Sequence, residues 1–565
     1  MARKERTYRW LFGAVLAVAT FFTRWPIRSR TLFEFDSIGF AIGAHRFDLD
    51  EVTPQMPGYI LHVLLGRFLN SLGIEINQAF VLLSVLLSIG SVLFLWRAAA
   101  QFRGERVAVI APLIWLTTPL FWFHGAINAI YIEEAFYTSI LLYLGLRWLN
   151  RGGRNWTIIA YFAVLSLATG TRETSFLFFL PATVYLLLNK KPTQKTLWFG
   201  IAAFVIITGL WAAELLRESG GLSTYLYFAR VENNFKTQSM LFGHGWHSQI
   251  GLIGKVLFYF VVALGGIWFI VLLSVVYLRR SIQFISDHIR NSKAIFVVLI
   301  AAVPLAFYLV IFFMKAGYLL NVLPSAILIS AVLIDQCAIW LAEWEKRRSS
   351  YPLKLTRPII TRNVALLSGI IVIVNVAWFV IPWPGTEQSQ YNNENTRNSF
   401  IHGAMDRYEH SGERNHTLAN RALEYTNVSG IRAVDSLNNM TLRALTENGA
   451  ADSGTVIIAS WWYRWCYALL PQAVTYDIEL DPVRQGALWV GRSHEFWRAN
   501  LYDSTIRFHS SRPVLLLLRH DRPDFDSLQK QLHLERLPLP EYLDIYRIRD
   551  TTFTLKWRDR MFIAE

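Results

Sequence analysis

The sequence predicts an α-helical polytopic membrane protein that ends in a smaller extracytoplasmic α/β domain. Hydrophobic residues make up 53% of the 565 residues and charged residues only 17%, whereas soluble domains carry about 25% charged residues. Apolar stretches near the length that crosses a hydrocarbon core, about 20 residues, recur through the first two thirds of the chain. After residue 385 they give way to shorter apolar runs, which indicates a second kind of structure.

The apolar stretches predict about eleven transmembrane helices. The first stretch follows a basic N-terminal segment and lacks a small-residue cleavage site, so we interpret it as a retained span rather than a signal peptide. The expected spans lie near residues 8–24, 77–97, 107–123, 131–147, 155–171, 174–189, 196–214, 252–278, 294–313, 318–342 and 363–382.

The loops between these spans predict the orientation of the chain. Lys and Arg concentrate in alternate connections, beginning with the N-terminus, and basic loops of this kind stay in the cytoplasm. This distribution explains the net charge of +14 without a nucleic acid partner. We therefore expect a cell-membrane protein with its N-terminus in the cytoplasm and its C-terminal domain outside.

One helix-like stretch, residues 57–73, would reverse this order if it crossed the membrane. It contains His62 and other polar residues, so we expect it to lie along the outer interface, as amphipathic helices do. The first outer loop, residues 24–76, would then carry juxtamembrane helices. A second long outer loop covers residues 215–251.

Residues 385–565 are expected to form a separate α/β domain that follows the transmembrane domain, residues 1–384. Strand-like and helix-like runs alternate there, which is typical of small α/β folds. No Gly-rich phosphate loop occurs, and two cysteines are too few for a thiolate metal site, so no cofactor is assigned and a divalent metal is left open. The expected strands are 455–459, 474–478, 488–490, 514–518 and 543–548, and the expected helices are 461–470, 494–501 and 525–534.

The acidic first outer loop contains the candidate for catalysis. Asp36 follows the first span closely, in the run Phe33-Glu34-Phe35-Asp36-Ser37. A carboxylate at this depth can act as a general base on an acceptor hydroxyl, and partial burial would raise its pKa and help it accept a proton. The alternative is that Asp36 only caps a helix that runs from Ser37 to His45.

This arrangement resembles the GT-C superfamily of polytopic glycosyltransferases, which includes the protein O-mannosyltransferases and the bacterial lipid A aminoarabinose transferases. The resemblance covers roughly residues 1–340. It rests on Asp36 early in the first outer loop, the Asp-x-x-x-Phe-Ala opening, and the turn Pro57-Gly58-Tyr59. It implies a GT-C-like fold, a catalytic Asp36 and a sugar donor linked to a polyprenyl phosphate. The chain departs from the family where Ser37 replaces an acidic residue.

A second departure concerns the phosphate of the donor. The aminoarabinose enzymes carry a Lys before a Pro-Pro turn, and here that region reads Gln55-Met56-Pro57. Other residues must therefore bind the phosphate. Arg172 lies in a very short outer turn, and its guanidinium suits phosphate oxygens, although an ion pair with Glu173 or snorkelling explains it equally well. Lys315 and Tyr318, in another short outer turn, are further candidates.

Five more residues are candidates for contact with the substrate. Glu134 opens the fourth span at its outer end, where a carboxylate is costly unless it has a partner. The remaining four lie in the outer loops, where a solvated position or an ordinary interfacial position is the competing interpretation. The five candidates are Glu134, His45, Asp48, Tyr59 and Arg230.

Together these features predict a membrane glycosyltransferase that moves a sugar from a polyprenyl-phosphate donor to an acceptor hydroxyl on the outer face. Attack opposite the phosphate would invert the anomeric configuration, with Asp36 as general base. The acceptor is a glycan, a lipid or a protein. The alternatives are a transporter or flippase for lipid-linked glycans, which would place charges at the span centres, and a glycan polymerase or ligase.

Overall fold

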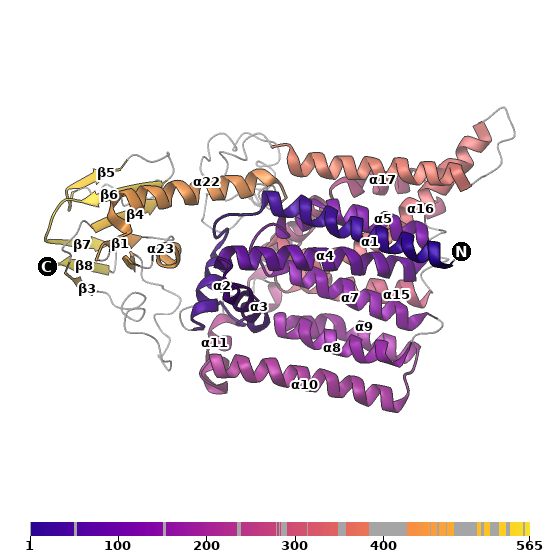
Figure 1. Ribbon diagram of the computed structural model, residues 1–565, viewed down its shortest axis with the longest axis horizontal. Coiled ribbons are helices and arrows are strands. Elements are labelled where there is room, and N and C mark those ends of the chain that lie inside the picture. Colours follow the sequence, from indigo (N-terminus) through magenta and orange to yellow (C-terminus); the bar gives the residue numbers. More distant parts are fainter. Residues whose placement is uncertain are drawn as a thin grey trace.

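The computed structural model shows a long helical bundle joined at one end to a region with two small β-sheets (Figure 1). The N-terminus lies at the far end of the bundle from the sheets. The described residues are 2–49, 53–150, 154–233, 239–277, 279–281, 283, 291–313, 315–348, 357–382, 426–452, 454–459, 463–470, 472–478, 505–509, 514–519, 530–537, 543–557 and 560–565.

The bundle consists of long apolar helices that run side by side (Figure 1). Each predicted span coincides with one of these helices or with a helix that is interrupted. The helices are α1 (Ala2–Arg24), α4 (Ile76–Arg103), α5 (Glu105–Thr117), α6 (Pro119–His124), α7 (Tyr131–Leu149), α8 (Asn155–Thr171), α9 (Thr174–Asn189), α10 (Gln194–Glu218), α12 (Gly245–Leu264), α13 (Trp268–Val276), α15 (Ser292–Val310), α16 (Leu323–Arg348) and α17 (Arg357–Val380).

Seven helical segments of the described chain are long and apolar enough to cross a membrane. The multi-span architecture is therefore confirmed. Fewer helices than the expected eleven or so are long and apolar enough to be identified as spans by length and composition. Helices α5, α8 and α9 have 13, 17 and 16 residues. Helix α7 carries Glu133, Glu134 and Arg147 among its 19 residues.

Two of the predicted spans are interrupted. The span 107–123 breaks at Thr118, which separates α5 from α6. The span 252–278 breaks at Gly265, whose φ of 51° favours glycine. A short 3-10 helix, η3 (Gly265–Ile267), follows before α13. The span 318–342 begins with another 3-10 helix, η4 (Ala316–Asn321), so only its later part belongs to α16.

Three short helices lie at the end of the bundle that faces the sheets (Figure 1). They are α2 (Phe35–His45), α3 (Ile60–Ser71) and α11 (Leu222–Asn233). Helix α3 has 12 residues and spans about 18 Å, which is too short to cross the bilayer. Its His62 is buried within the protein. Helix α3 packs against α4 through Gly66, which lies directly against the Phe80 ring.

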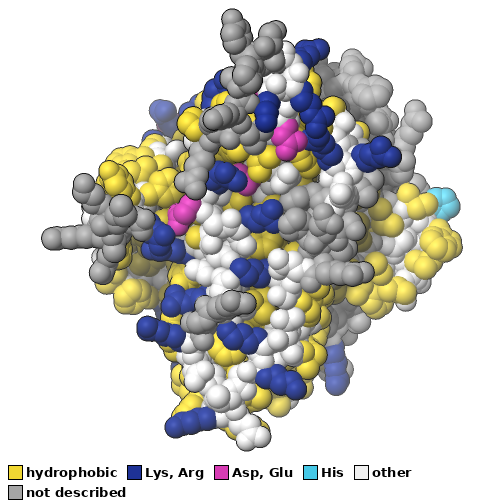
Figure 2. Space-filling model, turned by 90° about the vertical axis from the view of Figure 1, so that its right-hand side faces the viewer, with side chains coloured by type: hydrophobic (Ala, Val, Ile, Leu, Met, Phe, Trp, Pro, Cys, Tyr) yellow, Lys and Arg dark blue, Asp and Glu magenta, His cyan; other side chains and the backbone are white. Residues whose placement is uncertain are grey.

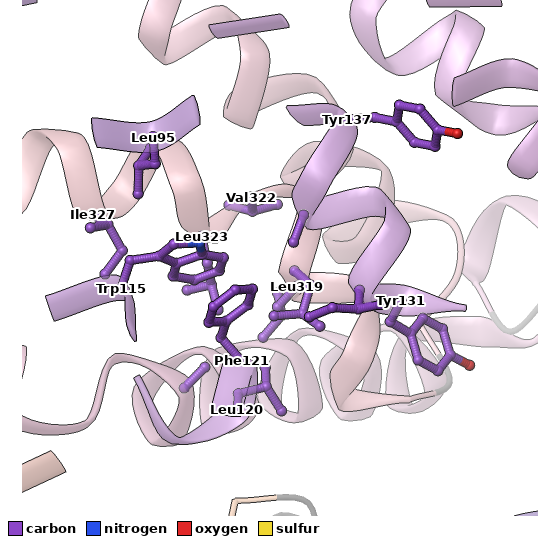
Figure 3. Packing of buried hydrophobic residues seen from close by; sticks show 14 of the residues in the cluster. Leu95, Trp115, Leu120, Phe121, Tyr131, Tyr137, Leu319, Val322, Leu323 and Ile327 are labelled. Carbon is purple, nitrogen blue, oxygen red and sulfur yellow. The ribbon is translucent and has the colours of Figure 1, made fainter. Parts of the chain in front are cut away.

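The centre of the bundle is packed with aromatic and aliphatic side chains (Figure 3). Trp115 of α5 and Phe121 of α6 stack with their ring centroids 3.9 Å apart. The break at Thr118 lets α6 fold back so that these two rings meet. Leu319 of η4 and Leu323 of α16 lie in the same cluster. This packing fixes the short helix η4, which directly follows Lys315.

The end of the bundle that carries the N-terminus is rich in Lys and Arg (Figure 2). Basic side chains are scattered over this face, and few acidic side chains accompany them in this view. The loops that were expected in the cytoplasm therefore lie together at one end. The orientation of that end in a membrane stays a prediction.

The described part of the C-terminal region starts at residue 426 and contains first α22 (Val428–Leu445) and then the π-helical turn η5 (Thr446–Ala450). One sheet has the strand order β2-β1-β4-β6-β5, and the other has the order β3-β8-β7. Strand β1 pairs parallel with β2 and β4, whereas β6 pairs antiparallel with β4 and β5. The elements after η5 are β1 (Val456–Ala459), α23 (Tyr463–Leu469), β2 (Val474–Asp477), β3 (Thr505–Phe508), β4 (Val514–Arg519), β5 (Leu534–Arg536), β6 (Leu543–Ile548), β7 (Phe553–Trp557) and β8 (Arg560–Ala564).

Mixed α/β structure in this region is confirmed. Four of the expected strands correspond to β1, β2, β4 and β6, and the expected helix 461–470 corresponds to α23. The expected strand 488–490, the helix 494–501 and the domain boundary at residue 384 lie outside the described residues. The described end of the expected helix 525–534 is a turn followed by β5, so a helix there is wrong. The division of the chain into two domains stays a prediction.

Candidate active site

The first outer loop enters α2 through a capping box. Glu34 is the N-cap, its side chain accepts from the backbone of Ser37, and the Ser37 hydroxyl accepts from the Glu34 backbone. Helix α2 therefore begins at Phe35, two residues earlier than expected. The interpretation that Asp36 caps the helix is wrong, because Glu34 has that role and leaves the Asp36 carboxylate for another partner.

The partner of Asp36 is Lys315, which precedes η4. The Lys315 ammonium donates to Asp36 Oδ2 at 2.6 Å and to Glu34 Oε2 at 2.9 Å. The three side chains are 18%, 22% and 8% exposed for Asp36, Lys315 and Glu34. Burial alone would lower the pKa of Lys315, but the two carboxylates outweigh burial and raise the pKa above its ordinary value. The two carboxylates therefore favour the charged form of Lys315 beside the candidate base.

A second ion pair joins Arg172 to Glu134. The Arg172 guanidinium donates to Glu134 Oε1, and Asn321 donates to the other carboxylate oxygen at 2.9 Å and to the Tyr308 hydroxyl at 2.6 Å. Both charged side chains are buried. Burial lowers the pKa of Arg172, but Glu134 outweighs it and raises the pKa above the usual value. The expected alternative partner, Glu173, instead accepts from the Tyr225 hydroxyl.

Aromatic side chains connect the two ion pairs. The Arg172 guanidinium lies 4.1 Å from the centroid of the Tyr318 ring, a cation–π arrangement. Tyr318 stacks on Tyr308 at 5.7 Å and meets the edge of Tyr131 at 5.5 Å. The Tyr59 hydroxyl experiences the charges of Arg172, Asp36 and Glu134, and burial raises the pKa of this phenol. Burial therefore favours the protonated form of the Tyr59 phenol, close to the charges of both pairs.

The structure therefore brings six of the predicted residues into one cluster, which we call the ion-pair cluster. Its predicted members lie on α2, α7, η4, the turn after α8 and the start of α3, which are far apart in the sequence. They are Asp36, Tyr59, Glu134, Arg172, Lys315 and Tyr318.

The other three predicted residues have different surroundings. His45 ends α2 and is exposed, and Arg230 is exposed near the end of α11. The Asp48 carboxylate lies 3.5 Å from Arg46, and its backbone pairs with Thr53. Substrate contact by these three residues stays a prediction.

Sequence reasoning missed several members of the cluster. Glu34 shares Lys315 with Asp36, and Asn321 and Tyr308 complete the environment of Glu134. The available signals were weak: a second carboxylate two residues before Asp36, and a lone amide six residues after Lys315. A partner 279 residues away along the chain, such as Lys315 for Asp36, has no local signature.

A further buried pair lies beside the cluster. His62 Nδ1 and Glu133 Oε1 are 2.7 Å apart, and each side chain is 1% exposed. The imidazole lies between Phe40 of α2 and Phe80 of α4, at centroid distances of 4.5 and 4.7 Å. This pair connects α3 to α7. Within the part of the chain that the structure describes, no group of three or more His, Cys, Asp or Glu side chains could hold a metal ion.

Comparisons with known proteins agree with this arrangement. Residues 57–211 match the family model described as dolichyl-phosphate-mannose-protein mannosyltransferase. This segment includes Tyr59, Glu134 and Arg172, whereas Asp36 and Lys315 lie outside it. No curated protein matches the chain by sequence.

The fold is similar to that of ArnT from Cupriavidus metallidurans. The apo structure of ArnT has a TM-score of 0.59 at 12% identity and covers 96% of this chain and 98% of its own. ArnT bound to undecaprenyl phosphate has a TM-score of 0.55 at 13% identity, with the same coverage. The apo oligosaccharyltransferase of Archaeoglobus fulgidus is less similar, with a TM-score of 0.44 at 11% identity, over 84% of this chain and 65% of its own.

The family match and the shared fold confirm the predicted resemblance to GT-C membrane glycosyltransferases. They also agree with the predicted class of enzyme.

Proposed function

We propose that this chain transfers a sugar from a polyprenyl-phosphate donor to an acceptor hydroxyl at the sheet-facing end of the bundle. The observation that carries the proposal is the Lys315 ammonium, which lies 2.6 Å from Asp36 and 2.9 Å from Glu34. A candidate base and a cation thus lie side by side, close to a second buried cation, Arg172. The ArnT structure bound to undecaprenyl phosphate supports a donor of this lipid class.

Asp36 acts as the general base in this mechanism. Its carboxylate takes the proton from the acceptor hydroxyl while the hydroxyl oxygen attacks the anomeric carbon. The bond from that carbon to the phosphate oxygen breaks on the opposite face, so the product has inverted configuration. Glu34 caps α2 and shares Lys315, which keeps the Asp36 carboxylate at a fixed position.

Lys315 and Arg172 stabilise the departing phosphate. Fixed cations in a partly buried site favour the negative charge that develops on the leaving group. The planar Arg172 guanidinium can bind two phosphate oxygens, and its stacking on Tyr318 fixes the plane. Glu134 accepts from the guanidinium and orients it, and Asn321 donates to the other oxygen of the Glu134 carboxylate. The Tyr59 hydroxyl can donate a hydrogen bond to a phosphate oxygen or a sugar oxygen.

The reaction takes place on the extracytoplasmic face in this proposal. The basic end of the bundle (Figure 2) corresponds to the cytoplasmic side by the positive-inside rule. The ion-pair cluster belongs to α2, α3 and the turns at the opposite end (Figure 1). The lipid tail of the donor would extend along the apolar helices, while the acceptor would approach from the C-terminal region.

The substitution Asp36→Asn tests the proposal in purified protein with a polyprenyl-phosphate sugar. Loss of a general base lowers turnover by about 10²–10⁴-fold. The matched control is Asp550→Asn, which alters a surface carboxylate that hydrogen-bonds His533 in the C-terminal region. Wild-type turnover by a well-folded Asp36→Asn protein would refute the assignment of the base.

A further inference from the structure

Helix α22 connects the helical bundle to the β-sheets (Figure 1). Its buried positions recur every three or four residues, as in a helix with one apolar face. Ile431 and Val434 pack into the core of the bundle, while Leu445 packs into the core of the sheet region. At its start, the Asn427 amide donates to Trp378 O and Ile381 O at the end of α17, at 2.6 and 2.8 Å. Helix α22 is thus anchored in both parts.

In the middle of α22, the Asp435 carboxylate accepts four hydrogen bonds from the first outer loop. Its Oδ1 accepts from the Ser29 hydroxyl at 2.8 Å, the Thr31 hydroxyl at 2.8 Å and the Thr31 backbone N–H at 3.0 Å. Its Oδ2 accepts from the Arg30 backbone N–H at 2.8 Å. One carboxylate therefore fixes three consecutive residues that lie more than 400 positions earlier in the chain.

Asn438, one helical turn further along α22, extends the same contact. Its amide donates to the Thr31 hydroxyl at 2.9 Å and to Leu32 O at 3.0 Å. We call Asp435 and Asn438 the α22 clamp. The clamped segment ends two residues before Glu34, the N-cap of α2 and a partner of Lys315. A shift of this segment would move Glu34 and Asp36 with it.

Helix α2 itself lies between the two parts of the molecule. Ile38, Ala41 and Ile42 pack with Trp465 and other residues of the sheet region. The opposite face packs into the bundle, where the Phe40 ring meets the edge of the His62 ring. The position of Asp36, one turn before Phe40, therefore depends on contacts from both sides.

We propose that Asp435 is a positioning residue for the transfer reaction. Through the α22 clamp, the C-terminal region sets the position of Asp36 relative to Lys315. This inference rests on the proposed function, because it predicts that loss of the α22 clamp lowers the rate of sugar transfer. It gives the C-terminal region a direct role in the reaction besides any contact with the acceptor. A displacement of about 1 Å in a reacting group can lower a rate by about 10²-fold.

The first test measures hydrogen exchange of the loop and needs no activity. In Asp435→Ala, the Arg30 and Thr31 amides lose their acceptor, so exchange should become faster over residues 29–37. The control Ser436→Ala changes the next residue, which is exposed, and should leave exchange unchanged. Unaltered protection of residues 29–37 in a folded Asp435→Ala protein would overturn the clamp, whatever the enzyme does.

The second test is kinetic. We expect Asp435→Ala to lower kcat by about 10–100-fold, with a much smaller change in the KM for the lipid donor. Asp435→Asn retains an oxygen for Ser29 and Thr31 and should show a smaller loss. The Asp435→Ala change should have little further effect in an Asp36→Asn background, because coupled residues are non-additive.

The outcomes separate this inference from the proposed function. If the two substitutions in the double variant Asp36→Asn/Asp435→Ala lower kcat independently, so that their fold-losses multiply, Asp435 only stabilises the fold. That result would contradict a positioning role. Faster exchange with an unchanged kcat would contradict it as well. Full activity of Asp36→Asn would instead refute the proposed base, while the exchange measurement would still decide whether the clamp exists.

Discussion

Lys315 is the residue on which the proposed site depends most. It is the shared partner of Asp36 and Glu34, and its raised pKa keeps it charged. We expect Lys315→Met to lower kcat/KM by about 10²–10³-fold, because a fixed charge that stabilises the leaving phosphate is lost. Assays with Lys556→Met, a change at an exposed lysine of β7, provide the control. Near-normal kcat/KM would remove Lys315 from the site.

The same residue predicts a stability difference that depends on pH. The pKa of Lys315 is raised in the folded chain, so its contribution to stability is fully present below the unfolded pKa of about 10.4 and is lost as the pH rises through the folded pKa. The difference in Tm between the wild type and Lys315→Met should therefore stay constant from about pH 7.5 to pH 9.5. A difference that disappears within that range would contradict the ion pairs.

Variants of Arg172 and its partner Glu134 can separate an effect on folding stability from an effect on catalysis. Arg172→Met leaves the Glu134 carboxylate buried without its cation, which should destabilise the fold by about 3–5 kcal/mol. The double variant Arg172→Met/Glu134→Leu removes both charges and should recover much of that loss in a thermal unfolding assay. Its activity should remain low, because the phosphate has lost a cation. Recovery of activity together with stability would make the pair purely structural.

At the scale of the elements, α3 is fixed by close packing as well as by the His62–Glu133 pair. A Cβ at Gly66 would lie 2.1 Å from the Phe80 ring, so Gly66→Ala should cost about 1–3 kcal/mol by overpacking. Gly209→Ala is the matched control, because a Cβ there meets nothing within 4 Å in helix α10. Equal unfolding temperatures for the two variants would show that α3 does not depend on this contact.

The elements also show what the sequence can and cannot predict. Every expected span overlaps a helix, because a long apolar run is a strong sequence signal for a membrane-spanning helix. The breaks at Thr118 and Gly265 were missed, since the residues on both sides of each break are apolar and the run looks continuous in the sequence. Helix α22 was missed because its apolar face is narrow, and β7 and β8 were missed because each has only five residues and includes a charged residue.

The candidate site was predictable only in part, for a related reason. Asp36, Arg172 and Lys315 stand out because charges at the ends of spans are expensive. Glu134 stands out for the same reason, whereas Glu34 and Asn321 do not, because they become partners only when separate helices pack together. Ser37, at the position where the similar enzymes have an acidic residue, is a member of the capping box in this chain.

At the scale of the whole molecule, the basic end of the bundle predicts the orientation in the membrane. We expect a cysteine at Lys191→Cys to react with an impermeant maleimide only in inside-out vesicles, and one at Asn439→Cys only in intact cells. Both substitutions are made in a chain whose two native cysteines, Cys337 and Cys466, have been replaced. These native cysteines are both buried. The reverse labelling pattern would place the ion-pair cluster on the cytoplasmic side and contradict the proposed extracytoplasmic reaction.

The central claim is that the ion-pair cluster binds the phosphate of the donor beside its general base. A structure of the chain with a polyprenyl phosphate bound tests this most directly. We expect the phosphate within hydrogen-bond distance of Lys315 and Arg172, with Asp36 facing the space that the acceptor would occupy. A phosphate bound elsewhere, with the contacts of Lys315 to Asp36 and of Arg172 to Glu134 unchanged, would contradict the proposed site.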